Sequence, residues 1–453
     1  MSRRFGRWVV AVAVWIAAVV VPGVVARASG EACGASVARV RSSPSVIIGE
    51  PGDVLACRMV RDGVVGARAW VVQYVSTDVR GQKIAVAGTV VVPDAPWTGS
   101  GARPLVAYAP GGLGLGARCS FSRRLVERPQ RSGTLRPDHA VRTGTATARS
   151  AAAADQVAAG LAAEGGGTGG SVGAYLRQGF AVVVADGVGR LDGQTPAFGV
   201  GAAAGHALLD GARAALRMPA AGLDPGTEVG LSGYSVGGSA SLWAAQLAAS
   251  YTPGLRVVGG AAGGVPGDLR AVAASQDGGV FAGYLVDVLV GLSAAYPSMP
   301  FDELLNEQGR RAVADARSAC GGETLSRFFF TRLEDLTTDR LTPDRFAQIE
   351  GDDGRTWGQI LADQRLGAGV GAAGSGARYQ VPFPVLQYRG AFEEVVPAST
   401  EDATATAYCR AGIATRYRAN YPGEHAATAK LAADDVARWL RDRFAGVPDR
   451  GTC

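Results

Sequence analysis

The residues of this chain best suited to chemistry surround a serine flanked by glycines, in residues 233–237 (GYSVG). A serine hydroxyl at its free pKa is a weak nucleophile, and it attacks a carbonyl carbon only when a neighbouring base removes its proton. Glycines on either side permit the strained and crowded backbone that such a serine adopts. The pentapeptide therefore predicts covalent catalysis at Ser235, with a base and an acid supplied from elsewhere in the chain.

The same pattern occurs a second time in residues 169–173 (GGSVG), and the chain contains 65 glycines, so chance matches are common. The neighbouring elements decide between the two serines. A predicted buried strand (228–231) precedes Ser235 and an alanine-rich helix (236–250) follows it. That order is the nucleophile elbow of the α/β-hydrolases. The glycine-rich stretch before Ser171 predicts no strand, so Ser235 is the predicted nucleophile.

The base must be one of three histidines, His139, His206 and His425. Along an α/β-hydrolase chain the serine comes first, the acid second and the histidine last. His139 and His206 both precede Ser235, whereas His425 follows it, just before the last predicted helix (426–444). By elimination, His425 is the predicted base.

The acid that orients this histidine is expected after a late strand. Residues 385–388 form such a strand, and Glu393 and Glu394 follow it. Either carboxylate can hold the imidazole tautomer and stabilise the imidazolium. Asp352 and Asp353 are weaker alternatives, because no strand precedes their charged turn.

A tetrahedral intermediate also needs two backbone donors for its oxyanion. One is expected to be the amide of Val236, the residue after the nucleophile. The other is expected from the loop 110–114 (PGGLG), which follows a predicted strand at 105–109. No Lys-Ser/Thr follows these glycines, which argues against a phosphate-binding P-loop.

The elements that position these residues form an alternating pattern. An antiparallel opening is predicted from strands at 69–75 and 84–93, after a mixed N-terminal arm at 29–60. Further strands at 180–185 and 256–260 alternate with helices at 171–178 and 205–218. The pattern predicts an α/β-hydrolase fold with a mostly parallel central sheet flanked by helices.

The predicted domain consists of three segments. Residues 29–265 are expected to form the first part of the core, with a loop-like insertion at 121–170 that includes a stretch of helical character. Residues 266–375 are mostly helical in pattern and are expected to form a lid or cap over the site. Residues 376–453 complete the core.

The first 28 residues have the form of a secretory signal peptide. Basic residues precede an apolar run (8–21), and residues 26–28 (ARA) form a cleavage site, so the protein is expected to be secreted. An uncleaved anchor is the alternative, although the run is short for a membrane span. The leader contains four arginines and no acidic residue, so its removal leaves basic and acidic residues nearly balanced. This balance gives no support to nucleic-acid binding.

Six cysteines lie beyond this leader, an even number that in an exported chain predicts three disulfides. Their wide spacing, without C-x-x-C pairs or Cys/His clusters, argues against zinc. We expect neither a metal nor another cofactor.

Several spaced motifs together resemble the secretory lipases related to Candida antarctica lipase A. Residues 74–78 with 84–93 are similar to that family's opening hairpin, and 209–215 to its helix before the elbow. Residues 233–238 (GYSVGG) resemble its G-Y-S-Q-G-G, and 393–397 (EEVVP) its D-E-V-V-P. The resemblance covers most of residues 50–445. It implies a helical lid, no cofactor, an acid at Glu393, and hydrolysis of lipid or other carboxylic esters.

The chain departs from the family pattern at several points. Glu393 stands where the family usually has Asp, and Val236 replaces a Gln. Residues 110–112 (PGG) replace H-G-T, which places the second oxyanion donor on Gly112. The family's pattern also implies disulfides Cys119–Cys320 and Cys409–Cys453, which leaves Cys33 with Cys57.

The leading hypothesis is a secreted serine esterase or lipase that forms an acyl-enzyme on Ser235. Its partner is then a small-molecule ester or lipid, with transient contact at a lipid interface. An exported acyltransferase with the same three residues is one alternative, since the two differ only in water exclusion and acceptor binding. A non-catalytic hydrolase-fold protein that binds lipid or a partner is the other.

Overall fold

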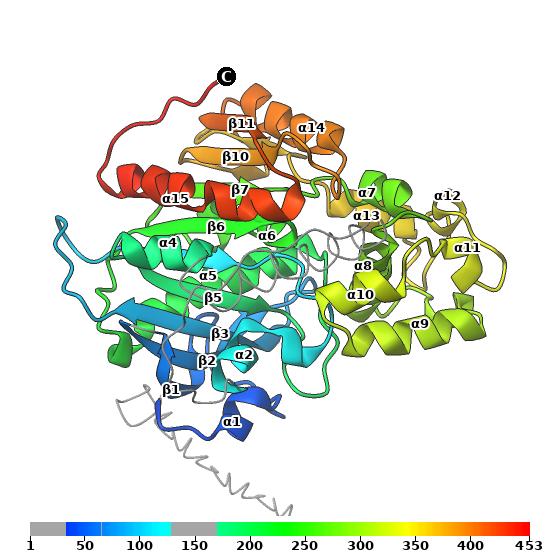
Figure 1. The fold of residues 1–453 in the computed structure, drawn as a ribbon, viewed down its shortest axis with the longest axis horizontal. Helices are drawn as coiled ribbons and strands as arrows, with labels where there is room; N and C mark the ends of the chain where they lie inside the picture. The colour runs from blue at the N-terminus through cyan, green and yellow to red at the C-terminus, as the bar shows by residue number, and fades with distance from the viewer. Residues whose placement is uncertain (1–32, 65, 128–169) are drawn as a thin grey trace, which may run out of the picture.

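A nine-stranded sheet organises the computed structural model, which describes residues 33–64, 66–127 and 170–453 (Figure 1). In sheet order the strands are β1 (Val54–Val64), β2 (Ala67–Thr77), β3 (Lys83–Pro93), β5 (Ala181–Gly187), β4 (Leu105–Ala109), β6 (Val229–Tyr234), β7 (Val257–Gly263), β10 (Val385–Gly390) and β11 (Thr415–Tyr421). The first three strands and β5 pair antiparallel, and every pairing from β5 to β11 is parallel. The predicted mostly parallel sheet is therefore present.

The inner strands are short runs of apolar and small residues, because both faces of the sheet are covered. Helices α5 (Gly201–Arg217) and α6 (Val236–Tyr251) pack on one face and bury their alanines and leucines there. Helices α4 (Ser171–Arg177) and α15 (His425–Phe444) pack together on the other (Figure 1). Two apolar layers thus hold the strand ends in fixed positions.

A set of helices between β7 and β10, which we call the helical block (residues 269–363), lies beside one end of the sheet (Figure 1). It consists of α7 (Leu269–Gln276), α8 (Ala282–Ala295), η4 (Asp302–Leu304), α9 (Glu307–Ser318), α10 (Gly321–Arg327), α11 (Leu333–Leu336), α12 (Pro343–Phe346) and α13 (Trp357–Asp363). Its side chains form their own apolar cluster, which also includes Phe198 and Val200 of the loop before α5. The helical block therefore has its own apolar core, which adjoins the core between the sheet and its helices.

The structure corrects the interpretation of residues 29–60 as a mixed arm. Their second half enters β1, an edge strand of eleven residues that pairs with β2. Cys33 is bonded to Cys57 in this strand, and the short α1 (Val37–Arg41) packs over β1 and β2. An edge strand with a polar and irregular sequence is difficult to predict, because only one side of the strand faces the core.

The remaining elements were not predicted from the sequence. They are η2 (Ala117–Cys119), α2 (Phe121–Glu127), η3 (Pro219–Ala221), α14 (Ala398–Arg410), β11 and a small sheet of β8 (Val370–Gly371) with β9 (Tyr379–Gln380). Helix α2 shows that the segment predicted as a loop-like insertion begins with a helix. The rest of that segment up to residue 169, the predicted leader and His139 lie outside the described residues.

Candidate active site

Ser235 occupies the turn between β6 and α6, at the carboxyl end of a central strand. Its backbone has φ 58° and ψ −128°, a region that non-glycine residues rarely adopt. The amide of Ser235 donates a 2.8 Å hydrogen bond to the carbonyl of Gly263 at the end of β7. The serine is thus held in a strained conformation by the neighbouring strand, as the nucleophile elbow requires.

The glycines around this serine are required by crowding. A Cβ atom on Gly233 would lie 1.9 Å from the carbonyl oxygen of Gly237, and one on Gly237 would lie 2.1 Å from that of Ala109. Neither neighbour is a flexible side chain that can give way. The close approach of β4, β6 and the start of α6 therefore excludes every residue but glycine at both positions.

His425 and Glu393 form a buried pair. Nδ1 of His425 lies 2.7 Å from Oε1 of Glu393, and the two side chains are 2% and 1% exposed. The same oxygen accepts the amides of Val395 and Val396 at 3.1 and 3.0 Å. Three donors, two from one loop and one from the start of α15, thus meet at a single carboxylate oxygen, which fixes the orientation of the imidazole ring.

The adjacent glutamates, which sequence left as alternatives for the acid, have different contacts. Glu393 contacts the ring, whereas Oε2 of Glu394 accepts the backbone amide of His425 at 2.9 Å. Burial raises the pKa of Glu393, but the charge and hydrogen bond of His425 and the two amides outweigh it, so the net pKa is lowered. Burial raises the pKa of Glu394. Glu393 is therefore the carboxylate that faces the imidazole.

Tyr234 and the loop after β7 bring His425 close to the elbow. The Tyr234 hydroxyl donates to the carbonyl of His425 at 2.6 Å, and the two rings lie 5.0 Å apart. A Cβ on Gly264 would lie 2.8 Å from Cε1 of the same ring. Tyr234 directly precedes Ser235 in the chain. The carbonyl of Gly263, the residue before Gly264, accepts the amide of Ser235. Ser235, His425 and Glu393 therefore lie together at the carboxyl ends of the parallel strands.

The other sequence candidates lie in different surroundings. His206 of α5 stacks on Tyr251 with ring centroids 4.1 Å apart, and its Nδ1 contacts the carbonyl of Thr77 at 3.1 Å. Burial lowers the pKa of His206. Asp352 and Asp353 lie in a turn of the helical block, where both contact Ser298. These contacts engage the side chains of His206 and Asp353 away from Ser235, whereas the contact of Asp352 is made by its backbone amide.

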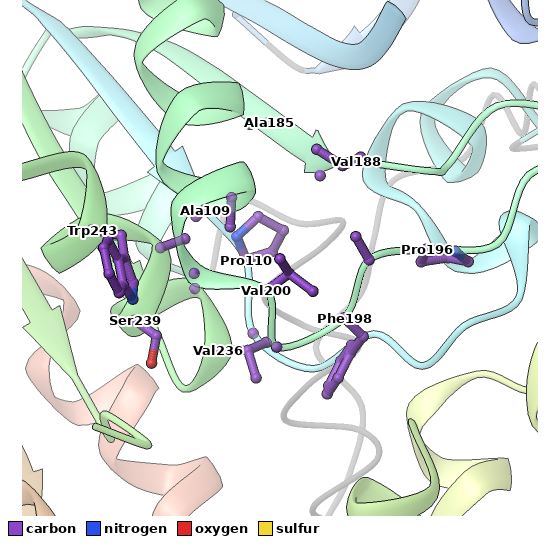
Figure 2. Close-up of a pocket in the computed structure, with 18 of the residues that line it drawn as sticks. Ala109, Pro110, Ala185, Val188, Pro196, Phe198, Val200, Val236, Ser239 and Trp243 are labelled. Carbon is purple, nitrogen blue, oxygen red and sulfur yellow. The ribbon is translucent and has the colours of Figure 1, made fainter. Parts of the chain in front are cut away.

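A pocket opens beside the elbow, and Figure 2 shows side chains that line it. Val236, Gly237 and Gly111 border it on the side of the serine. Most of the rest of its lining is apolar, with Leu113, Val188, Phe198, Val200, Trp243 and Leu269 among the contributors, while Asp186, Arg190, Ser239 and Gln364 are its polar members. An apolar chain of a substrate therefore has a place next to Val236.

The loop predicted to supply the second oxyanion donor lies between this pocket and the helical block. Gly111 and Leu113 line the pocket, whereas Gly112 packs beneath the rings of Tyr284 and Phe198, 3.3 and 3.6 Å from the place of a Cβ. The first turn of α6 supplies the other predicted donor, since the amide of Val236 at its start has no acceptor within the helix.

A family model described as secretory lipase matches residues 170–451 of this chain. The chain belongs to the secretory lipase family. The match spans the elbow, the helical block and the loops of Glu393 and His425.

Relatives of known name agree with this membership. The chain is 31% identical over 287 residues to the probable inactive lipase MT1628 of Mycobacterium tuberculosis, with 61% of this chain and 58% of that one covered. It is 30% identical over 287 residues to the secreted triacylglycerol lipase LIP4 of Malassezia globosa, with 62% and 58% covered. The chain therefore spans 58% of the length of either relative.

The fold is that of Candida antarctica lipase A. The structure of that protein in its closed state aligns with a TM-score of 0.72 and 23% identity, covering 91% of this chain and 87% of the other. The esterase LipA of Xanthomonas oryzae aligns at 0.60 and 14% identity, over 88% and 99%. The predicted α/β-hydrolase fold is confirmed.

The three disulfides of this chain are those implied by its resemblance to the family. Cys33–Cys57, Cys119–Cys320 and Cys409–Cys453 are all formed. The second joins the loop after β4 to the helical block, where Gly114 and Cys320 also pair as an isolated bridge. That corner of the helical block is therefore fixed to the core beside the pocket.

Two negative findings concern the described residues only. Among them, no group of three or more His, Cys, Asp or Glu side chains is arranged to hold a metal ion. None of their helices is long and apolar enough to cross a membrane.

The sequence did not predict the hydrogen bonds that Tyr234 and Glu394 make with the backbone of His425. Tyr234 is a variable position of the G-x-S-x-G pattern, and its hydrogen bond joins residues 191 positions apart. Glu394 was considered only as an alternative to Glu393. The available signal was the doublet of acids that precedes His425 in the chain.

Proposed function

We propose that this secretory lipase is a secreted carboxylic-ester hydrolase, of the lipase or esterase type, that forms an acyl-enzyme on Ser235. The observation that carries the proposal is the buried 2.7 Å contact between His425 Nδ1 and Glu393 Oε1, located beside a serine with a strained backbone. A histidine held in this way presents its other ring nitrogen as a base.

The proposed reaction has two halves. Oγ of Ser235 attacks the ester carbonyl carbon while Nε2 of His425 takes the hydroxyl proton, and Glu393 stabilises the imidazolium that forms. The amides of Val236 and Gly112 hold the oxyanion. As the intermediate collapses, His425 returns the proton to the leaving alcohol. Water then attacks the acyl-enzyme by the same steps and releases the acid.

Substrate class follows from the pocket. Its apolar lining between the loop after β4 and α7 suits the acyl chain of a lipid or another carboxylic ester. The helical block borders this pocket through Leu269, and we propose that it serves as the lid over the site. Secretion is supported by the form of residues 1–28 and by a relative that is a secreted triacylglycerol lipase.

A non-catalytic role is the second candidate, and two observations favour it. A relative of 31% identity is a probable inactive lipase, and Gly112 packs beneath aromatic rings and is absent from the pocket lining. A protein with a poorly placed oxyanion donor still binds lipid in the same pocket. Reactivity of Ser235 separates the two candidates.

The decisive experiment measures hydrolysis of p-nitrophenyl esters of increasing acyl length by the mature protein and by Ser235→Ala. We expect hydrolysis by the wild type and loss of it in the variant. Equal rates in the two proteins would exclude Ser235 as the nucleophile. Absence of both hydrolysis and fluorophosphonate labelling in the wild type would favour the non-catalytic role.

A further inference from the structure

A second buried carboxyl group lies behind Glu393 and takes no part in the proposed mechanism. Glu401 belongs to the first turn of α14, and its side chain is 3% exposed. Its Oε1 accepts the amide of Val265 at 2.8 Å. Val265 directly follows Gly264, whose backbone packs against the ring of His425. Glu401 therefore reaches the short loop that separates β7 from the helical block and borders the histidine.

Two buried carboxyl oxygens in this region have no hydrogen-bond partner among the described residues. They are Oε2 of Glu393 and Oε2 of Glu401. The two groups are close enough for the negative charge of Glu393 to act on Glu401. A buried polar atom without a partner costs about 1–3 kcal/mol, so two of them in adjacent groups require an explanation.

A single proton satisfies both atoms. A neutral carboxylic acid accepts at one oxygen and donates from the other, and Oε1 of Glu401 already accepts from Val265. We propose that Glu401 is a positioning residue for the triad: its protonated Oε2 donates a hydrogen bond to Oε2 of Glu393, directly or through one bound water. This role rests on the proposed function, because it holds the carboxylate that orients His425.

The charges around Glu401 agree with a neutral acid. Burial is the main cause that raises its pKa to about 9, and the negative charges of Glu393 and, to a smaller extent, Asp402 add to it. The amide of Val265 and the charge of Arg389 oppose the rise but do not overcome it. Arg389 of β10 is engaged with Asp402 and with Tyr417 of β11, which leaves its charge largely balanced.

Three variants test this role. Glu401→Gln keeps an acceptor for Val265 and a donor for Glu393, so we expect it to retain most of the wild-type kcat. Glu401→Leu removes both, and we expect kcat to fall about tenfold with little change in KM, the effect of one lost hydrogen bond. Ser399→Ala is the matched control on the same helix turn, because this exposed side chain carries no charge, and we expect it to keep the wild-type kcat and KM.

The pH profile of ester hydrolysis gives a second readout. As the pH rises through about 9, Glu401 loses its proton, cannot donate to Glu393, and adds a second negative charge beside it. We expect wild-type kcat to fall across this range, and Glu401→Gln to lack the fall. Ser399→Ala should show the same fall of kcat as the wild type, because Glu401 and the charges around it are intact.

Thermal unfolding gives a readout that needs no activity. A glutamate whose folded pKa is raised contributes stability that is fully present below its unfolded pKa and is lost as pH rises through the folded value. For Glu401 that window runs from its ordinary pKa of 4.5 up to about 9. The Tm of Glu401→Gln should equal that of wild type below pH 4.5 and exceed it increasingly from there up to pH 9.

The outcomes separate the two proposals. A Tm difference that does not change with pH would overturn the protonated state of Glu401, whatever the activity. If Glu401→Leu kept the wild-type kcat and also kept the fall of kcat at alkaline pH, the positioning role of Glu401 would be overturned. Absence of hydrolysis by the wild type would overturn the proposed function and with it that role, while leaving the protonation measured by unfolding in place.

Discussion

The two serines in G-x-S-x-G patterns differ in structure although their letters agree. Ser235 ends a buried central strand and has φ 58°, so the chain reverses sharply at its Cα. Ser171 is the first residue of α4, after Gly170 with φ −105° in the extended region. Both side chains are largely buried, at 9% and 5% exposed. Burial therefore does not distinguish them, whereas the strand before the turn does.

The elements beyond each turn extend the difference. Ser235 is followed along the sheet edge by the loops that hold Glu393 and His425, because parallel strands β6, β7 and β10 all end there. Ser171 begins a helix that packs against α15 and β5 on one face of the sheet. A nucleophile needs partners from several loops, and the carboxyl ends of parallel strands supply them.

The largest expected effect tests which serine reacts. Ser235→Ala should lower kcat on a nitrophenyl ester by on the order of 10⁵-fold, since removal of the attacking oxygen leaves only binding and oxyanion stabilisation. Ser171→Ala should change kcat little. Mass spectrometry after fluorophosphonate treatment should find the label on the peptide of Ser235 alone. A label on Ser171 would show that the strand before the turn does not determine which serine reacts.

A smaller effect separates the two adjacent acids. Glu393→Gln should lower kcat by about 10³- to 10⁴-fold, because an amide cannot stabilise the imidazolium or hold the required tautomer. Glu394→Gln keeps an oxygen that can accept the amide of His425 and removes no contact to the ring. We expect it to lower kcat by less than tenfold. Equal losses in both variants would show that the pair acts as a unit.

The smallest expected effect concerns the glycines of the elbow. Gly237→Ala should lower the free energy of unfolding by about 3 kcal/mol or more, since its Cβ meets two backbone carbonyls at 2.1 and 2.5 Å. Gly254→Ala is the matched control, because no atom lies within 4 Å of its added Cβ.

We expect the Gly254→Ala control to change the free energy of unfolding by about 0.5 kcal/mol or less. Urea unfolding of both variants measures the difference. A Gly237→Ala protein as stable as wild type would show that the elbow is less crowded than this structure indicates.

Much of the fold was predictable because its inner strands are short apolar runs between glycine-rich turns. β3 and β4 were predicted with nearly the observed bounds, and α6 and α15 followed from alanine-rich and amphipathic stretches. β1 and β11 were missed. β11 alternates buried and exposed residues at the far edge of the sheet, and its arginines gave no apolar run to detect.

The sequence by itself determined the nucleophile and the base, because a serine after a predicted strand and a histidine late in the chain leave few alternatives. It could not choose between Glu393 and Glu394 without a family resemblance, since adjacent residues share every local signal. Only the tertiary structure decided that Glu393 faces the imidazole ring while Glu394 binds its backbone. Only the structure placed Glu401 behind them, because that contact depends on how α14 packs against the loop after β7.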